Sequence, residues 1–341
     1  MSPQLRRITL AATKIIFAFA AASVSFRGFG PSACEAAPAA RTVTPAESLT
    51  QRVGPVAQRI LSLRIISPND ARSASRRASG VVVGTRGDRT TIVSSVYGLD
   101  EEPASIVITS AGQERRLATL IALDRTYGLA LLEAPRLAVD EPSDLLIGES
   151  DGVSPKVGAV AIALGRSLGR LTVSRGVVSA RRAQGTLLQT DAKLSPLNYG
   201  GLLVSRGDAP PYGLIVPRDV GPMSAAALYD SGVGFAVVWL TVLERVAKMR
   251  EHGDLEPGRL GLSLAGSDPL REPAVVEAVE PAGAAAAAGL QPGDRIVSLE
   301  GRPITAFLLS RRTALLDAGD RVRLGLARDG SRSEVVIVLG R

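Results

Sequence analysis

The chain has 341 residues, of which 45% are hydrophobic, 4% are aromatic and 21% are charged. This length exceeds one small domain and fits two domains with a tail. A single cysteine excludes an intramolecular disulfide, and a single histidine, His252, leaves little capacity for a zinc site. The net charge of +7 permits binding to acidic surfaces, but no zinc-finger or RNP pattern is present. We therefore expect no metal, no cofactor and no nucleic-acid partner.

Residues 1–37 have the features of a signal peptide or membrane-attachment segment. Basic residues precede an apolar run at 15–26 that is too short to span a bilayer comfortably, and small residues follow it. Three outcomes are open: cleavage near residue 36, lipidation at Cys34, or retention as an uncleaved anchor. Each outcome places the body of the chain outside the cytoplasm.

A small, Pro-rich linker at residues 38–47 precedes the first domain, which we place at 48–240. Helical spacing at 48–60 opens this domain. Short apolar runs then alternate with glycine-containing turns, a pattern typical of an antiparallel sandwich or barrel. The clearest of these expected strands lie at 80–84, 91–95, 105–109, 129–132, 159–163 and 176–179.

The clearest helix is expected at 241–252, where Glu244 and Lys248 form an i,i+4 pair and Gly253 supplies a stop. We assign residues 241–256 to this linker helix and a boundary. A second domain follows at 257–341. Its expected strands lie at 259–264, 274–279, 295–299, 322–327 and 334–339, and its helical patterns at 282–288 and 306–316.

An ordered set of short motifs runs through both domains, and together they resemble the HtrA family of serine proteases. The most specific are LQTDA at 188–192 followed by NYGG at 198–201, and GLQPGD at 289–294. The weaker ones lie at 80–97, 123–132, 157–165, 173–180 and 232–238. The resemblance implies a mostly β chain, with a trypsin-like double six-stranded β-barrel domain followed by a PDZ domain, a small β-sandwich with two helices.

The resemblance also assigns the catalytic positions, and each carries an unexpected residue. The family's histidine falls on Tyr97, its aspartate on Gly128, its serine on Tyr199 and its oxyanion-hole glycine on Leu197. A phenol with a pKa of about 10 does not accept a proton from a hydroxyl at neutral pH. A leucine disfavours the positive φ that glycine makes available. We therefore expect a degenerate triad with no catalytic residues.

Three other residues are candidates to replace the triad. Ser195 and Lys193 lie near Tyr199 in sequence and suggest a Ser–Lys dyad, but nothing in the sequence fixes their geometry. His252 lies in the expected linker helix, where a surface position near the C-terminus favours positive charge. We interpret all three as ordinary loop or surface residues.

The PDZ resemblance implies a peptide-binding site. In that family a backbone loop holds a peptide C-terminal carboxylate, and the peptide adds as a strand to the sheet edge. The matching residues here are Arg259, Leu260, Gly261, Leu262 and Leu264, with Leu264 assigned equally to the core and to the pocket.

Our main hypothesis is a catalytically inactive HtrA-like pseudoprotease of the cell envelope, in the periplasm or on the extracytoplasmic membrane face. It would act as a scaffold or regulator that binds C-termini or extended segments of envelope proteins. Assembly as a homo-oligomer, a trimer by resemblance, or with active relatives is also implied. The alternatives are a serine endopeptidase for protein quality control with a rearranged active site, and a structural or membrane-surface protein that uses its positive charge.

Overall fold

The computed structural model describes residues 49–67, 75–99, 103–138, 155–205, 210–218, 231–266, 270 and 272–341. The expected export segment, its Cys34 and the linker at 38–47 lie outside these residues. No helix in the described part is long and apolar enough to cross a membrane.

The first barrel is a closed ring of six antiparallel strands in the order β1-β2-β3-β6-β5-β4. Its inward-facing side chains form an apolar core that includes Leu61, Leu63 and Ile92. Closure pairs both edges of the sheet, which leaves no unpaired edge strand in the barrel. The strands are β1 (Ile60–Ile66), β2 (Ser75–Arg86), β3 (Arg89–Ser95), β4 (Ser105–Thr109), β5 (Arg115–Asp124) and β6 (Leu129–Pro135).

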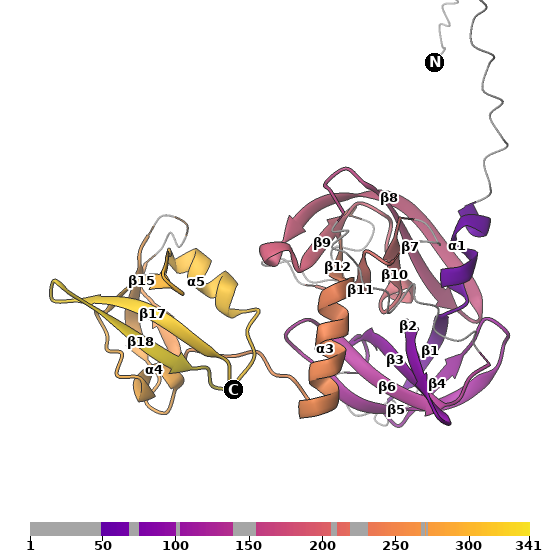
Figure 1. Ribbon diagram of the computed structural model, residues 1–341, viewed down its shortest axis with the longest axis horizontal. Coiled ribbons are helices and arrows are strands. Elements are labelled where there is room, and N and C mark those ends of the chain that lie inside the picture. Colours follow the sequence, from indigo (N-terminus) through magenta and orange to yellow (C-terminus); the bar gives the residue numbers. More distant parts are fainter. Residues whose placement is uncertain are drawn as a thin grey trace, which may run out of the picture. The chain divides into compact units, whose positions relative to one another are not determined.

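The second barrel is also closed, in the order β10-β11-β12-β9-β8-β7 (Figure 1). Its longest hairpin, β7–β8, pairs without a bulge from Val160↔Val177 to Ser167↔Arg170. The strands are β7 (Val160–Ser167), β8 (Arg170–Arg182), β9 (Leu187–Thr190), β10 (Leu202–Val204), β11 (Gly213–Val216) and β12 (Gly234–Val238). The two closed six-stranded barrels confirm the fold expected for the first domain.

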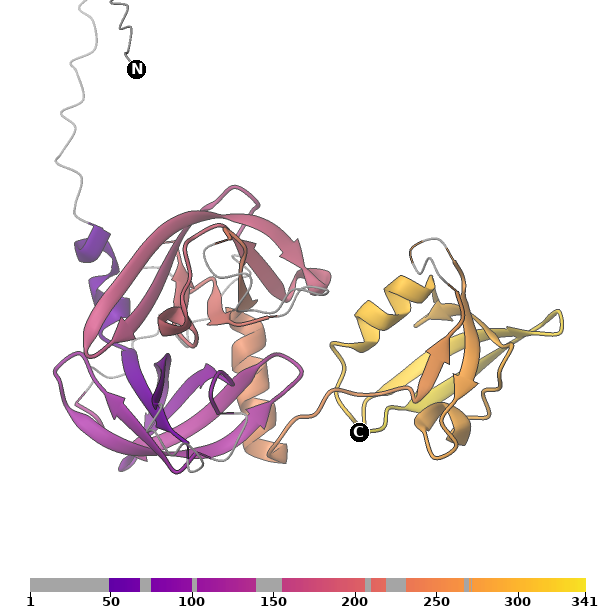
Figure 2. The same cartoon turned by 180° about the vertical axis from the view of Figure 1, so that it is seen from behind.

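Two helices pack against the barrels. The helix α1 (Leu49–Ala57) is shorter than the expected 48–60, because Ile60 already begins β1. The helix α3 (Trp239–His252) directly follows β12 (Figure 2). The apolar face of α3, including Val242, Val246 and Met249, joins one core cluster with residues of both barrels. This shared cluster makes the barrels one packing unit.

Arg166 links α1 to the first and second barrels. Its buried guanidinium donates to the carbonyl oxygens of Ile60 (2.5 Å), Ala57 (2.6 Å) and Gly169 (2.8 Å). These bonds satisfy carbonyls at the end of α1, the start of β1 and the β7–β8 turn. Burial lowers the pKa of Arg166 below its ordinary value.

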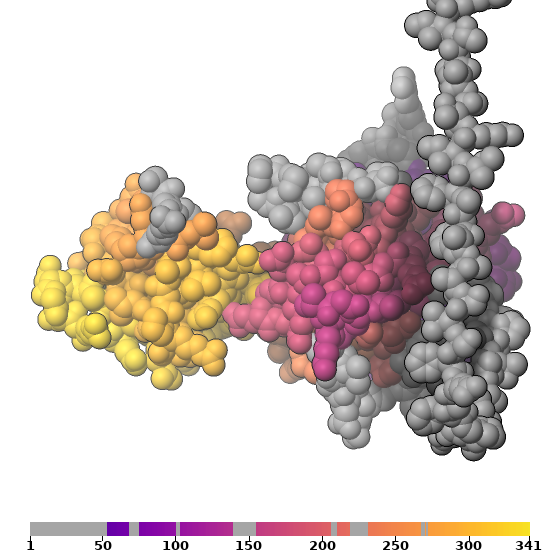
Figure 3. All heavy atoms as spheres, turned by 90° about the horizontal axis from the view of Figure 1, so that it is seen from above, coloured from indigo at the N-terminus to yellow at the C-terminus, as the bar shows by residue number. Residues whose placement is uncertain are grey.

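The C-terminal domain is a six-stranded sheet with β13-β14-β15-β17-β18 in order and β16 paired to β15. Its bounds are β13 (Leu262–Leu264), β14 (Ala274–Val279), α4 (Ala284–Ala287), β15 (Arg295–Leu299), β16 (Arg302–Pro303), α5 (Ala306–Thr313), β17 (Arg321–Arg328) and β18 (Ser331–Val338). The sheet and two helices confirm the expected PDZ fold. Figure 3 shows one face of this domain, coloured orange to yellow. The strand expected at 259–264 begins only at Leu262, because Gly261 turns the chain with a φ of 69°.

A buried ion-pair cluster centres on Arg245 of α3. Its Nε lies 2.6 Å from Asp124 Oδ2, and its Nη1 lies 2.6 Å from Asp317 Oδ2. Lys248 Nζ and Thr126 Oγ1 also bond to the Asp317 carboxylate, at 2.5 and 2.7 Å. Burial raises the pKa of Asp124 although Arg245 acts to lower it. The cluster ties the end of β5, the linker helix and the segment after α5 together.

Candidate functional site

Tyr97 and Tyr199 form an aromatic pair where the two barrels meet. Tyr97 follows β3, and Tyr199 follows the short 3₁₀ turn at Pro196–Asn198. Their ring centroids are 5.3 Å apart with 66° between the ring planes, an edge-to-face contact. Burial raises the pKa of Tyr199 above its ordinary value, and Tyr97 adds to this effect. Tyr199 therefore stays a neutral phenol at neutral pH.

Gly128 lies beside this pair. The N–H of Val96 donates to the Gly128 carbonyl at 3.0 Å, which places Gly128 next to the residue that precedes Tyr97. Gly128 has a φ of 74°. The structure thus places Tyr97 against Tyr199 and Gly128 against Val96, the residue before Tyr97. Asp124, four residues earlier, is engaged by Arg245.

The loop that precedes Tyr199 is tightened into a 3₁₀ turn. The N–H groups of Asn198 and Tyr199 donate to the carbonyls of Ser195 and Pro196, at 2.8 and 3.2 Å. Leu197, the expected oxyanion-hole position, lies inside this turn, and its carbonyl accepts from Ser79 Oγ at 2.6 Å. An N–H that closes a turn is not available to an oxyanion, so the turn occupies at least one donor of an oxyanion hole.

Main-chain hydrogen bonds fix this loop between the barrels. Ser79 N–H donates to the Tyr199 carbonyl at 2.8 Å, Gly200 N–H donates to Ile215 at 2.7 Å, and Ile215 N–H returns to Gly201 at 2.8 Å. Gly200 has a φ of 81°, and a Cβ there would lie 2.1 Å from the Ser79 carbonyl oxygen. Only glycine fits this position.

The structure shows the surroundings of the three residues that are candidates to replace the triad. The Ser195 hydroxyl bonds to Asn198 Oδ1 at 3.1 Å. Lys193 is exposed at the rim of the loop. His252 lies in the last turn of α3, is exposed, and has its Nε2 3.8 Å from the Glu251 carboxylate. These contacts give Ser195 and His252 ordinary structural surroundings.

The five residues expected to bind a peptide line one pocket. Arg259, Leu260, Gly261, Leu262 and Leu264 all border a cavity of about 490 Å³ between β13 and α5. The opposite wall comes from α5 through Leu309, Ser310 and Thr313. Leu264 lines the pocket and also packs on the domain core.

Backbone geometry directs two amide groups of this loop toward the pocket. The Leu260 carbonyl accepts from Ala285 N–H at 2.8 Å, and the Gly261 carbonyl accepts from Glu280 N–H at 2.9 Å. In a trans peptide the next N–H points opposite to each carbonyl. The N–H groups of Gly261 and Leu262 therefore face away from α4 and β14, as a carboxylate-binding nest requires.

Both domains match families of known proteins. The trypsin-like peptidase domain family matches residues 78–209, and the PDZ domain family matches residues 248–327. The periplasmic serine endoprotease DegP of Escherichia coli K12 is 28% identical over 285 residues, which cover 76% of this chain and 56% of DegP. A probable periplasmic DegP-like endoprotease of Pseudomonas fulva is 30% identical over 289 residues, covering 79% of this chain and 57% of the relative.

The chain is a relative of the HtrA/DegP-type, PDZ-containing serine proteases. It spans slightly more than half the length of these two curated relatives. Among solved structures, the HtrA-type protease AlgW with a tripeptide has a TM-score of 0.64 at 24% identity, covering 86% of this chain and 97% of AlgW. The serine endoprotease of Yersinia pestis has a TM-score of 0.63 at 24% identity, with 87% and 98% coverage. At these identities the structures support the fold.

One residue of the HtrA-like peptide pocket was missed by the sequence reasoning. Glu280 also lines the cavity, and its Oε2 lies 3.2 Å from where a Cβ of Gly261 would stand. A carboxylate there repels a second carboxylate at the same loop. No sequence signal marks it, since its place depends on the approach of the chain after β14 to the loop before β13.

Proposed function

We propose that the chain acts as a peptide- and protein-binding member of the HtrA/DegP-type family at the cell envelope, without cleavage at the family's catalytic position. The observation that carries the proposal is the pairing of Tyr97 and Tyr199 at 5.3 Å where the family's base and nucleophile would stand. Binding is assigned to the cavity bordered by Arg259–Leu264 and α5.

The chemistry of the tyrosine pair supports the non-catalytic part. Acyl transfer needs a base near neutral pKa, a nucleophile that it activates and an oxyanion hole. Tyr199 is a neutral phenol whose pKa burial raises, and its own N–H donates to Pro196. The only histidine of the chain, His252, lies in α3 rather than in a barrel strand or its loops.

A second candidate is a working serine endopeptidase with a rearranged site. The curated relatives favour it over an inactive scaffold, because each of them described above is named a serine endoprotease. Ser195 is the residue on which this candidate depends, since its hydroxyl lies in the loop that bears Tyr199. The two candidates give opposite results in one assay.

The deciding experiment is labelling with a fluorophosphonate probe together with casein digestion. We expect no labelling and no cleavage by the purified full-length protein. The matched control is Ser195→Ala, which should behave like the parent. Labelling of the parent that disappears in Ser195→Ala would establish the endopeptidase and overturn the non-catalytic proposal.

Restoring the family residues tests whether the site geometry is otherwise competent. The combined change Tyr97→His, Gly128→Asp, Tyr199→Ser and Leu197→Gly rebuilds base, orienter, nucleophile and oxyanion hole. Gly128 has open space around its Cβ direction, with the nearest atom 3.9 Å away, and aspartate tolerates a positive φ better than most residues. We expect measurable probe labelling from this variant and none when Ser replaces Tyr199 alone.

Peptide binding is tested with pairs of extended peptides that end in a free carboxylate or in an amide. We expect preference for the free carboxylate, and Arg259→Gln should weaken it. Glu280→Gln removes a like charge worth about 1 kcal/mol at an exposed site, so Kd should fall about fivefold. Arg302→Gln, at an exposed strand outside the cavity, is the control. Equal affinity for both peptide ends would contradict carboxylate capture.

The names of the DegP relatives support a periplasmic location, and hence envelope proteins as partners. Peptide complexes of AlgW, which shares the fold, support peptide capture by the PDZ domain. We extend the proposal to an exported protein that binds C-termini or extended segments of envelope proteins, as a homo-oligomer or with active relatives. Size-exclusion chromatography with light scattering measures the assembly, and fractionation of cells locates the protein.

A further inference from the structure

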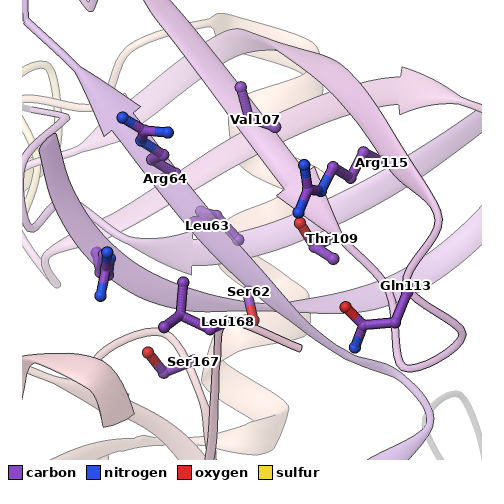
Figure 4. A pocket seen from close by; sticks show the side chains of 10 residues that line it. Ser62, Leu63, Arg64, Val107, Thr109, Gln113, Arg115, Ser167 and Leu168 are labelled. Atoms are coloured by element: carbon purple, nitrogen blue, oxygen red, sulfur yellow. The ribbon is translucent and has the colours of Figure 1, made fainter. Parts of the chain in front are cut away.

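Another pocket, of about 170 Å³, lies on the outer face of the first barrel beside the tip of the β7–β8 hairpin (Figure 4). None of its lining residues belongs to the tyrosine site or to the peptide cavity. Three of them are arginines: Arg64 on β1, Arg77 on β2 and Arg115 on β5. We call it the three-arginine pocket.

Strand register explains why these arginines share one face. Arg64 stands directly opposite Arg77 on β2, and its neighbours Leu63 and Ile65 point into the barrel core. Arg115 stands opposite Thr109 of β4. Because side chains alternate along a strand, this places the three guanidinium groups on two adjacent rungs of the outer surface.

The charge of the pocket is one-sided. It is lined by three arginines and no carboxylate. Within the described part of the chain, none of the three guanidinium groups has an ion pair or a hydrogen-bond acceptor. Like charges directly opposite each other on neighbouring strands are destabilising, so the Arg64–Arg77 pair costs stability unless an anion lies between them.

Other arginines of the same barrel do have carboxylate partners. Arg116, next to Arg115, pairs with Glu114, and Arg89 lies 3.8 Å from Glu133. These two neighbouring arginines thus have carboxylate partners, which the three arginines of the pocket lack within the described residues.

Neutral donors complete the pocket. Thr109 and Ser167 present hydroxyls and Gln113 presents an amide, and all three line the cavity with the arginines. Guanidinium groups bind phosphate oxygens through paired N–H donors, and hydroxyls add further donors to the same oxygens. The pocket volume of about 170 Å³ is larger than the volume of several water molecules, since one water takes up about 30 Å³ in the liquid. The pocket therefore has room for an anion larger than water.

The rim of the pocket is apolar. Leu168 stands at the hairpin tip with 66% of its surface exposed and a φ of 51°. Leu117 of β5 is also exposed, opposite Val107 of β4. The arginines can bind a phosphate group, and the exposed leucines can contact an apolar group attached to it. The pocket therefore suits both a phosphate with an apolar substituent and free phosphate.

We propose that the three-arginine pocket binds a phosphate group, carried by a soluble phosphate monoester or by an anionic phospholipid headgroup. Arg64 and Arg77 hold the anion from one rung, and Arg115 with Thr109 holds it from the next. The bound anion offsets the repulsion between Arg64 and Arg77. This function is independent of catalysis and of peptide capture.

The test is calorimetric titration of the full-length protein with inorganic phosphate and with glycerol phosphate, in a chloride buffer. A flotation assay runs beside it, with phosphatidylcholine vesicles that contain or lack phosphatidylglycerol. The site variant is Arg64→Gln, Arg77→Gln and Arg115→Gln combined. The control variant removes the same charge from exposed positions of the C-terminal domain: Arg302→Gln, Arg321→Gln and Arg332→Gln.

We expect saturable binding of phosphate that the site variant loses and the control variant keeps. Each single arginine change should weaken it about tenfold, as expected for a charge-assisted hydrogen bond. Arg115→Lys keeps the charge and loses the paired donors, so weaker binding by this variant also supports the proposal if the triple variant does not fold. Without phosphate, Arg64→Gln should melt no lower than the parent.

The two sources of phosphate separate in the flotation arm. Flotation with phosphatidylglycerol that the site variant alone loses assigns the pocket to a headgroup. Phosphate binding without flotation assigns it to a soluble ligand. Absence of saturable phosphate binding, equal losses in the site and control variants, or binding of a glutamate-rich peptide in place of phosphate would overturn the proposal.

Discussion

Replacing Arg245 with Met removes the cation between two buried carboxylates. The Arg245 side chain is 10% exposed, while those of Asp124 and Asp317 are 0% and 4% exposed. Methionine fills much of the same volume without the charge. Asp317 keeps its bond to Lys248, whereas the Asp124 carboxylate keeps, among the described residues, only the backbone N–H of Tyr127 as donor. Most of the cost therefore falls on Asp124.

Removing one partner of a buried ion pair costs about 3–5 kcal/mol, because an uncompensated charge stays buried. We expect a loss near the lower end, about 3 kcal/mol at pH 7, since Asp317 retains its other partners. For a folded unit of this size, about 3 kcal/mol lowers Tm by roughly 6–12 °C.

The loss of stability caused by Arg245→Met should also depend on pH. Burial already raises the pKa of Asp124, and Arg245 acts against that rise. Loss of Arg245 raises the pKa further, so the folded variant takes up a proton before the unfolded chain does. The stability deficit therefore shrinks as pH falls from about 7 to about 5.

Urea unfolding and thermal melting at both pH values measure these effects. The matched control is Arg89→Met, since Arg89 and Glu133 are 48% and 33% exposed and such surface pairs contribute about 1 kcal/mol or less. Adding Asp124→Asn to Arg245→Met should recover much of the loss. A loss no larger than that of Arg89→Met, or a deficit that does not change with pH, would refute the buried-pair reasoning.

Three further predictions follow from buried or constrained groups. Burial acts to raise the pKa of Asp317, but its hydrogen bonds, first from Arg245, lower it to about 2. The stability that ionised Asp317 contributes is therefore present above pH 3.8 and is lost as pH falls toward about 2. The unfolding free energy of Asp317→Asn in urea should change less over this pH range than that of the parent. Gly200→Ala should cost about 2 kcal/mol or more in urea unfolding, whereas Gly158→Ala, with a φ of 87° and nothing within 4 Å, should cost about 1 kcal/mol. Arg166→Met leaves buried carbonyls without donors and should lower unfolding free energy by about 3 kcal/mol, measured the same way. Equal costs for the two glycine changes, or an Arg166→Met cost below about 1 kcal/mol, would contradict these contacts.

Much of the fold was predictable because β-strands leave a local record. Apolar runs bounded by proline or glycine located β14 and β15 at their observed bounds. The closure of the two barrels leaves no local pattern in the sequence, because closure pairs strands such as β1 and β4, whose residues are far apart along the chain. Only the ordered motifs of a known family supplied that expectation.

The motifs singled out Tyr97, Gly128 and Tyr199 as the candidate site, and its geometry was less predictable. The structure places Tyr97 against Tyr199 and Gly128 against Val96. The 3₁₀ turn that uses the Tyr199 N–H was missed, although Ser195 and Pro196 are a helix-start signal. The Asp124–Arg245–Asp317 cluster was missed because charge partners from three separate segments carry no sequence periodicity.

Main-chain hydrogen bonds of Ser79, Gly200, Gly201 and Ile215 hold the loop around Tyr199, and the side chains of Ser79 and Asn198 add further bonds. None of these bonds depends on which side chain occupies position 199. The backbone conformation of the loop can therefore stay the same when the side chain at position 199 changes. A substitution at position 199 is therefore expected to keep the backbone path of the loop, while the loss of the buried Tyr199 ring removes its packing against Tyr97.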